Sequence, residues 1–246
     1  MQIKISIIIA SYNAEVNLKK ALNSVINQKF QDWECLVIDG ASKDGTLAIA
    51  HEYADKDARI KVFSEPDAGV YDAFNKGWKH AKGEWIYYLG ADDELLPNGL
   101  SVLISKSDGV DLVYGGIVRR YANGKTKQVP PGNFEYCMPF SLGASHQAII
   151  MKRNLIEKLG GFKLKYRILA DFDLINNAYY VGIKTRRCDN FIAIFQIGGL
   201  STDNLSSLKE RFDILTSYAV PKEKAFFHCL KMGILFCLYK IKHRYF

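Results

Sequence analysis

The sequence predicts an α/β fold in which helices flank a mixed, mostly parallel, Rossmann-like sheet, with a C-terminal helical tail. Three observations predict this class. Short apolar runs alternate with amphipathic helical segments over roughly the first sixty residues, which is the pattern of βαβ units. A polar cluster directly follows each of three apolar runs, as expected where ligands bind beyond the carboxyl ends of parallel strands. The 246 residues are also enough to bury one substantial core.

The N-terminal half shows the alternation most clearly. Residues 4–10 form a short, β-branched and continuously apolar run, which is typical of a strand buried on both faces of a parallel sheet. Apolar residues from Leu18 to Ile26 recur at helical spacing and predict an amphipathic helix. The further elements expected here are strands at 33–39, 60–64 and 85–89, and helices at 47–54 (capped by Thr46), from Val70 to Trp78 and from Asn98.

The second half loses this regular alternation, so we expect antiparallel strands and a less regular layer there. Ala122-Asn123-Gly124 is a hairpin turn signal between two strand-like segments. The elements expected are strands at 110–118, 125–129, 148–151 and 191–197, helices at 154–159 and 171–180, and a glycine-rich loop at 198–201. Because we find no linker or internal repeat, we predict one domain at 1–220, with halves of about 1–115 and 116–220, and a basic amphipathic helix at 221–246.

Charge and cysteine content narrow the function classes. The formal net charge of +7 indicates an anionic partner, which could be nucleic acid, a phosphorylated small molecule or an anionic membrane surface. The five cysteines are odd in number and include no Cys-x-x-Cys pair, so neither a disulfide framework nor a zinc site is expected. Neither a signal peptide nor an apolar stretch long enough to span a bilayer is recognisable, and we therefore expect a cytoplasmic protein.

The most informative polar cluster follows the apolar run Trp85–Leu89. Two adjacent carboxylates, Asp92 and Asp93, come almost at once after this run. Carboxylates at the end of a rigid strand suit a hard divalent cation that keeps open positions for phosphate oxygens, although Asp also closes ordinary turns. The clusters at 11–13 and at Asp39 are expected to lie along the same sheet edge. Three polar clusters at three strand ends are more than the turns alone require.

Eight short motifs follow one another along residues 3–201. They are Ile-Ile-Ala-Ser-Tyr-Asn at 8–13, Val-Ile-Asp-Gly-Ala-Ser-Lys-Asp-Gly-Thr at 37–46, Ser-Glu-Pro-Asp-Ala-Gly-Val-Tyr-Asp-Ala-Phe-Asn-Lys-Gly at 64–77, Gly-Ala-Asp-Asp at 90–93, Ser-His-Gln at 145–147, Gly-Gly-Phe at 160–162, Ala-Asp-Phe-Asp-Leu at 170–174 and Gly-Gly-Leu-Ser at 198–201. Each motif alone is weak, but in this order the chain resembles the family 2 glycosyltransferases, which have the GT-A fold. The block at 64–77 is most similar to enzymes that build bacterial surface polysaccharides of the colanic-acid or O-antigen type.

The resemblance implies a nucleotide-sugar donor, most simply a UDP-sugar. Asp39 would accept a hydrogen bond from the N–H of a uracil-like base. The other residues implied on the nucleotide side are Ser11, Tyr12, Asn13, Asp67 and Asp92. Asp92 would face the ribose or help to bind a metal, Asp93 would ligate Mn²⁺ or Mg²⁺ directly, and His146 would reach the metal or the diphosphate. Many relatives carry a third carboxylate where this chain has Gly90, which leaves the division of work between Asp92 and Asp93 open.

The resemblance also implies a general base. Asp171 would lie opposite the departing nucleotide and take the proton of an acceptor hydroxyl, so that a single displacement inverts the anomeric carbon. Relatives often carry an acidic residue where this chain has Ala170, and Asp173 is therefore the second choice. A carboxylate at a helix start, such as Asp171, could also be a simple cap.

The C-terminal segment 225–239 combines aromatic and aliphatic side chains with a basic flank. Such a segment suits a helix at an anionic membrane surface, here the inner face of the cytoplasmic membrane, or one docked onto the catalytic domain. Membrane contact would fit a saccharide acceptor carried on polyprenyl diphosphate. Two alternative functions are a nucleotidyltransferase and a non-catalytic module that binds sugar or nucleic acid. A nucleotidyltransferase would need a Gly-rich loop with a basic residue after the first strand, and residues 11–13 do not form one. A module that only binds sugar or nucleic acid has no need of both a carboxylate pair and a separately placed base. Because this chain has both, we expect no nucleic-acid partner.

Overall fold

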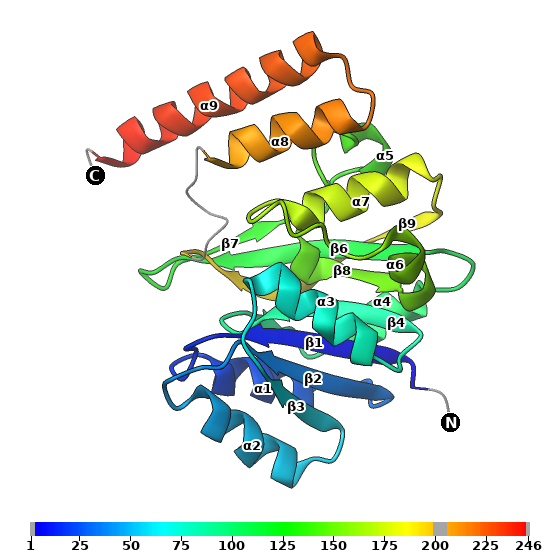
Figure 1. Ribbon diagram of the computed structural model, residues 1–246, viewed down its shortest axis with the longest axis vertical. Coiled ribbons are helices and arrows are strands. Elements are labelled where there is room, and N and C mark those ends of the chain that lie inside the picture. The colour runs from blue at the N-terminus through cyan, green and yellow to red at the C-terminus, as the bar shows by residue number, and fades with distance from the viewer. Residues whose placement is uncertain (1–2, 199–205, 245–246) are drawn as a thin grey trace.

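The computed structural model describes residues 3–198 and 206–244. One mixed sheet of nine strands runs through these residues and carries helices on both faces (Figure 1). Its strands are β1 (Ile5–Ser11), β2 (Trp33–Asp39), β3 (Ile60–Ser64), β4 (Trp85–Gly90), β5 (Glu94–Leu95), β6 (Leu112–Arg120), β7 (Thr126–Val129), β8 (Ile149–Lys152) and β9 (Thr185–Gln196). The helices are α1 (Leu18–Ile26), α2 (Thr46–Lys56), α3 (Val70–His80), α4 (Gly99–Ser105), α5 (Phe134–Cys137), the 3₁₀ helix η1 (His146–Ala148), α6 (Arg153–Leu159), α7 (Ala170–Tyr180), α8 (Ser206–Ser217) and α9 (Lys222–Arg244).

The N-terminal strands form the parallel part of the sheet, in the order β3-β2-β1-β4. Every residue of β2 is buried, and so is nearly every residue of β1, because both strands are mostly apolar and lie between two layers of helices. The pairing register places Ser11 beside Asp39 and Ala10 beside Gly90. The polar clusters that follow β1, β2 and β4 therefore lie at one edge of the sheet, as the sequence predicts.

The second half makes the sheet a mixed one. β8 pairs antiparallel with β4 and β6, β7 pairs antiparallel with β6, and β9 pairs parallel with β6. The predicted fold class, an α/β fold with a mixed, mostly parallel sheet flanked by helices, is confirmed. β9 begins at Thr185 rather than at the predicted residue 191, because its polar first residues also pair with β6. The predicted domain limits stay predictions.

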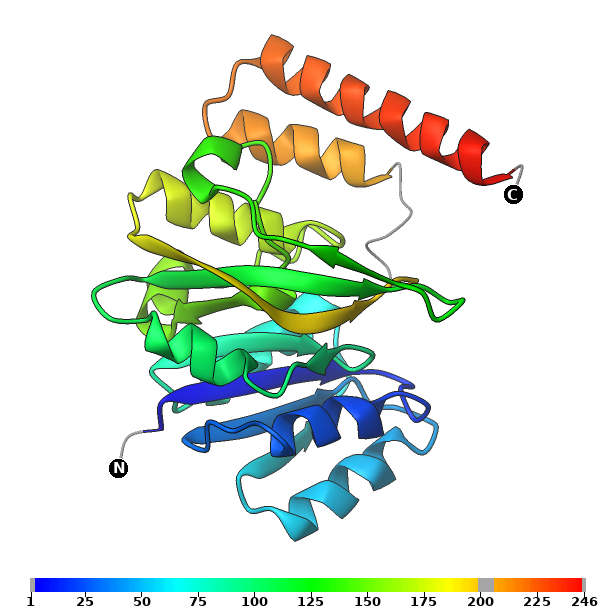
Figure 2. The same cartoon turned by 180° about the vertical axis from the view of Figure 1, so that it is seen from behind.

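Two helical layers cover the sheet, and side chains of β1 alternate between them. Ile8 packs in the apolar cluster of α3, α6 and α7, together with Phe74 and Phe172. Ile7 and Ile9 pack in the opposite cluster, which includes residues of α1 and α4, and these helices face the viewer in Figure 2. This alternation follows from the two-residue period of a strand. In β1 the two polar side chains, Ser6 and Ser11, lie near the ends of the strand.

The prediction that Thr46 caps α2 was wrong. Thr46 is the first helical residue, and its hydroxyl accepts a hydrogen bond from the backbone N–H of Ala14 at 2.6 Å. The side chain of Asp44 instead accepts a hydrogen bond from the backbone N–H of Thr46 at 3.0 Å. Thr46 thus ties the loop after β1 to the loop after β2.

Two helices at the C-terminal end stack outward from α7, with α8 next to α7 and α9 beyond α8 (Figure 1). The first, α8, was not predicted from the sequence, and it buries Ile214 and Leu215 in the same cluster as Phe172. The second, α9, lies within the segment 221–246 predicted as a helix, and it packs on α8 through buried Ala225 and Cys229. Within the described ranges, no helix has both the length and the apolar character that crossing a bilayer requires.

Candidate active site

A buried and an exposed carboxylate stand side by side after β4. Asp92 is exposed, whereas Asp93 is only 2% exposed. The two oxygens of Asp93 accept hydrogen bonds from the side chain of Gln147 at 3.0 Å and from the backbone N–H of Gln196 at 2.9 Å. Burial and the charge of Asp92 raise the pKa of Asp93 to about 6, although these hydrogen bonds and the charge of His146 act in the opposite direction. A bound cation would stabilise the ionised form of Asp93, which burial and the charge of Asp92 disfavour.

Both carboxylates line a cavity of about 370 Å³, which we call cavity A. Cavity A lies between the loop after β1, the start of α3 and the end of β4. Its polar lining residues are Tyr12, Asn13, Asn17, Tyr71, Asp92, Asp93, His146, Gln147 and Arg167. Five predicted site residues are among them, namely Tyr12, Asn13, Asp92, Asp93 and His146.

Asp39 lies near this edge but does not line cavity A. It is fully buried, and its oxygens accept hydrogen bonds from the hydroxyls of Ser11, Ser42 and Ser64 and from the backbone N–H of Ser42. These four bonds use all the positions at which a carboxylate readily accepts. A contact with a nucleotide base would have to replace one of them, and this contact stays a prediction.

Asp67 is the remaining residue predicted on the nucleotide side. Its carboxylate accepts a hydrogen bond from the backbone N–H of Gly69 at 2.8 Å. A Cβ atom at Gly40 would lie 2.6 Å from an Asp67 oxygen, so Asp67 packs against the end of β2 beside Asp39. Neither Asp67 nor Ser11 lines cavity A, and their nucleotide contacts also stay predictions.

A larger cavity of about 930 Å³, cavity B, adjoins cavity A. The two share the lining residues Tyr71, His146, Gln147, Ile168 and Phe195. Asp171 lines cavity B, whereas Asp92 and Asp93 line cavity A. The carboxylate pair and Asp171 therefore lie on two sides of one shared wall, with His146 in it.

Asp171 is held by two side chains of this wall. His146 Nδ1 lies 3.1 Å from one oxygen of Asp171, and the hydroxyl of Tyr71 lies 3.1 Å from the other oxygen. The single proton of this hydroxyl is shared between Asp171 and the carbonyl oxygen of Ile168 at 2.7 Å. Burial raises the pKa of Asp171, but the hydrogen bond and charge of His146, with the bonds from Phe172 N–H and Tyr71, outweigh it and lower the pKa overall. Burial lowers the pKa of His146, but Asp171 and then the Asp93 and Asp92 charges raise it above its usual value. Asp171 is thus kept ionised.

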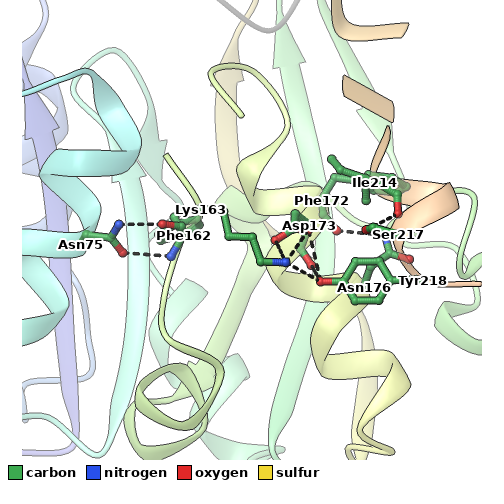
Figure 3. A network of polar contacts seen from close by, with 9 residues as sticks. All are labelled: Asn75, Phe162, Lys163, Phe172, Asp173, Asn176, Ile214, Ser217 and Tyr218. Atoms are coloured by element: carbon green, nitrogen blue, oxygen red, sulfur yellow. Dashed lines mark hydrogen bonds and ion pairs between the residues drawn. The ribbon is translucent and has the colours of Figure 1, made fainter. Parts of the chain in front are cut away.

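Asp173, the second candidate base, faces elsewhere. It is 1% exposed, lines neither cavity, and pairs with Lys163 at 3.1 Å (Figure 3). The hydroxyl of Tyr218, at the end of α8, also hydrogen-bonds the Asp173 carboxylate at 3.2 Å. Asp173 therefore joins α7 to the loop after α6 and to α8, whereas Asp171 faces cavity B.

Glu210 of α8 holds the turn in front of Asp171. Its carboxylate accepts hydrogen bonds from three consecutive backbone N–H groups, those of Arg167 (2.8 Å), Ile168 (3.0 Å) and Leu169 (2.9 Å). α7 has no side-chain cap of its own at Leu169. Glu210 therefore supplies a cap from another helix, which fixes where α7 begins.

We expect Glu210→Gln to loosen this turn and to destabilise the protein by about 1–3 kcal/mol, because charge-assisted hydrogen bonds become neutral or are lost. Amide hydrogen exchange at Arg167, Ile168 and Leu169 should accelerate. Glu223→Gln, at an exposed position of α9, is the control and should leave both exchange and melting temperature unchanged. Equal exchange in both variants would contradict the capping role.

Sequence reasoning missed several residues of the two cavities. The Ser-His-Gln motif predicts no role for Gln147, although its side chain donates to Asp93 and its carbonyl accepts from buried Tyr87. The motif at 64–77 likewise predicts no role for Tyr71. Arg167 in cavity A and Arg211 in cavity B cannot be recognised from the sequence, because isolated arginines carry no pattern. The predicted loop at 198–201 lies outside the described residues except for Gly198.

The carboxylate pair fits a divalent cation. Among the residues that the structure describes, no three His, Cys, Asp or Glu side chains cluster as a metal site. Asp92 and Asp93 would therefore supply two hard oxygen ligands, and phosphate oxygens and water would complete the coordination of Mn²⁺ or Mg²⁺. The raised pKa of Asp93 agrees with this fit, since a cation would relieve the repulsion between the two acids.

Residues 6–166 match the family described as glycosyl transferase family 2. A PGL/p-HBAD biosynthesis glycosyltransferase of Mycobacterium tuberculosis is 34% identical over 204 residues, which cover 80% of this chain and 78% of the relative. A GalNAc(5)-diNAcBac-PP-undecaprenol beta-1,3-glucosyltransferase of Campylobacter jejuni is 37% identical over 115 residues, or 46% of this chain and 37% of the relative.

The fold is also similar to that of a solved structure. TarS residues 1–349 of S. aureus in complex with UDP-GlcNAc superimposes with a TM-score of 0.71 at 20% identity, over 90% of this chain and 69% of that one. In another structure of TarS 1–349 the present chain spans 64% of that chain. Asp171 and Glu210 both lie beyond the residues of the family match, so the structure rather than the match places Asp171 at cavity B and Glu210 at the turn before it.

Proposed function

The chain belongs to glycosyl transferase family 2, and we propose that it is an inverting, metal-dependent enzyme that transfers a sugar from a nucleotide sugar to a hydroxyl of a saccharide acceptor. Family membership makes it a glycosyltransferase and excludes both alternatives that the sequence leaves open, the nucleotidyltransferase and the non-catalytic binding module. One observation supports the finer proposal most. Cavities A and B share a wall, with the carboxylate pair on one side and Asp171 on the other.

We assign cavity A to the donor, with a UDP-sugar as the first candidate. TarS, which shares the fold, was solved with UDP-GlcNAc, and this supports the nucleotide but does not identify the sugar. Tyr12 and Asn13 offer an aromatic face and an amide, and Arg167 offers a cation for phosphate oxygens. The metal held by Asp92 and Asp93 would neutralise charge on the leaving diphosphate.

We assign cavity B to the acceptor and Asp171 to the base. In the proposed reaction the acceptor hydroxyl loses its proton to an Asp171 oxygen while its own oxygen bonds the anomeric carbon. The bond from that carbon to the phosphate oxygen breaks at the same time, and the nucleotide diphosphate leaves with the electron pair. Attack from the side opposite the leaving group inverts the anomeric configuration. Tyr71 and His146 hold the carboxylate in position for this step.

The pH dependence of transfer should report the pairing of His146 with Asp171. His146→Gln removes the positive partner, so the pKa of Asp171 should rise and the acid limb of kcat/KM should move to higher pH by about one unit. His80→Gln is the control, because exposed His80 stacks on Phe63 and lines neither cavity. An acid limb that stays in place in His146→Gln would contradict the proposed pairing.

The acceptor is proposed to be lipid-linked, in the synthesis of a bacterial surface polysaccharide such as O-antigen. The relative from Campylobacter jejuni is named for an undecaprenol-linked substrate, which supports this class of acceptor for the present chain. The protein would then work at the inner face of the cytoplasmic membrane.

The outer side of α9 is proposed as the membrane contact. Six large apolar side chains on α9 are exposed, namely Phe226, Phe227, Leu230, Ile234, Leu235 and Leu238. On a helical wheel they occupy the side opposite Ala225 and Cys229, which pack against α8. Their exposure, together with the basic residues at the end of the chain, suits an anionic bilayer surface.

Sedimentation with vesicles tests this contact. The triple variant Phe227→Ser, Leu230→Ser and Ile234→Ser should lose binding to phosphatidylglycerol vesicles by about tenfold or more, because it removes apolar area that would enter the interface. Wild-type protein should bind these vesicles better than phosphatidylcholine vesicles. Equal binding of wild type and triple variant would show that α9 does not mediate the contact.

A panel of nucleotide sugars tests the proposed function itself. Binding of the correct donor with Mn²⁺ should raise the melting temperature, since a ligand at a hundredfold its Kd adds about 2.7 kcal/mol of stability. A UDP-sugar is expected to give the largest shift, and chelation of the metal should reduce it. Stabilisation by no nucleotide sugar, with either Mn²⁺ or Mg²⁺, would reject the proposal.

A further inference from the structure

Arg211 of α8 points a partly buried guanidinium group at cavity B. Its Nη1 donates to the backbone carbonyl of Phe140 at 3.0 Å, and its Cζ lies 4.3 Å from the ring centroid of Phe172. Its Nε is buried and has no hydrogen-bond partner among the described residues. A buried donor without a partner is costly, so an acceptor from a ligand would be favourable there.

Two further cations line the same cavity. Arg119 of β6 and Lys127 of β7 lie directly opposite each other across the antiparallel pair, and both are exposed. Like charges at such opposed positions repel each other, and an anion between or beside them would remove that repulsion. In the described part of the chain, neither residue forms an ion pair, and neither does Arg211.

Cavity B offers these cations almost no counter-charge. Asp171 is the one carboxylate among its described lining residues, and it is already bound to His146 and Tyr71. An uncharged saccharide would not require three cations at the side of the base. Arginine in particular is suited to phosphate, because its planar fork of N–H groups matches phosphate oxygens.

The position of Arg211 also relates the cavity to α9. α8, which carries Arg211, packs directly under α9, and Cys229 of α9 donates to the carbonyl of Leu208. The other side of α9 exposes the apolar residues described above. A phosphate bound at Arg211 would thus lie on the side of cavity B nearest the proposed membrane contact.

We propose that Arg211, Arg119 and Lys127 form an anion subsite in cavity B, which binds a phosphate or diphosphate group of the acceptor. The inference rests on the proposed function, because it takes cavity B as the acceptor side. It narrows the acceptor to a sugar joined to a phosphate or diphosphate.

Titration calorimetry with geranyl diphosphate, in EDTA so that no metal recruits the probe to cavity A, tests the subsite directly. Arg211→Gln should weaken binding by about tenfold or more, because it removes a charge-assisted hydrogen bond to the phosphate. Arg211→Lys should bind with intermediate affinity. Arg186→Gln is the matched control, since exposed Arg186 lines neither cavity, and it should behave like wild type. Inorganic pyrophosphate and geraniol as separate probes distinguish a contribution of the phosphates from one of the hydrocarbon.

Asp93→Asn distinguishes the two cavities, since it should leave geranyl diphosphate binding unchanged. If Arg211→Gln fails to fold, the double variant Arg119→Gln and Lys127→Gln replaces it, because both side chains are exposed. Equal binding by wild type and the cavity B variants, binding by geraniol alone, or a loss of binding in Asp93→Asn would each overturn the subsite.

Failure of the subsite and failure of the proposed function give different results. If a nucleotide sugar binds and is transferred, but Arg211→Gln leaves geranyl diphosphate binding unchanged, the transferase stands and the subsite does not. If no nucleotide sugar binds, but geranyl diphosphate binds in an Arg211-dependent manner, the anion site stands and the proposed reaction does not.

Discussion

Asp171→Asn is expected to reduce sugar transfer by about 10²–10⁴-fold, the usual contribution of a positioned general base. An Asn at this position keeps the size of the side chain and can still accept from the hydroxyl of Tyr71, but it cannot take a proton from the acceptor. The affinity for the nucleotide sugar should stay within about twofold of wild type, because Asp171 lines cavity B and not cavity A. Steady-state kinetics and donor binding by calorimetry measure the two quantities separately.

Asp173→Asn is the informative control for this experiment. Asp173 is buried and paired with Lys163 and Tyr218, so its loss should lower the melting temperature, by the equivalent of about 1–3 kcal/mol, while the folded enzyme keeps most of its kcat. The reverse result, full activity in Asp171→Asn and none in folded Asp173→Asn, would assign the base to Asp173 instead.

Asp93→Asn is expected to abolish most of the metal-dependent binding of the donor, by about tenfold or more. The variant loses one anionic ligand of the proposed cation and leaves Asp92 as the remaining carboxylate of the pair. Donor affinity with Mn²⁺ should fall to the level that wild type shows in EDTA. Retention of a Mn²⁺-dependent gain in affinity would reject Asp93 as a metal ligand.

The stability of the same variant without metal should depend less on pH than that of wild type. The pKa of Asp93 is about 6 in the folded protein against an ordinary 3.8, so the folded state binds this proton more tightly than the unfolded state. Stability is therefore lost as the pH rises from about 4 through about 6, on the order of 2–3 kcal/mol. Asp93→Asn removes this titration, although its amide nitrogen can no longer accept one of the two hydrogen bonds that Asp93 receives. Its free energy of unfolding in EDTA should therefore fall less than that of wild type between about pH 4 and about pH 7. An equal fall in both proteins would contradict the raised pKa of Asp93.

The local pattern of apolar and polar residues was sufficient to locate the first four strands and the sheet edge at which their polar ends gather. β1, β2 and β4 are apolar runs that stop at polar clusters, and a parallel sheet brings such strand ends to one edge whatever the details of packing. The carboxylate pair could be located for the same reason. Its environment could not, because Gln147 reaches Asp93 from 54 residues away along the chain.

The second half was harder to predict because its side-chain partners are distant in sequence. α8 carries no motif, yet its Glu210 caps the turn before Asp171 and its Arg211 lines cavity B. The two carboxylates of α7, Asp171 and Asp173, look alike in the sequence, and only their surroundings distinguish them.

The sequence by itself determined the α/β class and the sheet edge where the polar residues gather, because these depend on short-range patterns of apolar and polar residues. Its eight motifs, and not this pattern, carried the resemblance to the family. The tertiary structure decided which acids face a cavity, which are used up by internal hydrogen bonds and which side chains hold the base. Burial and hydrogen-bond partners set the charge and orientation of a carboxylate, and both arise only when segments far apart in the chain pack together.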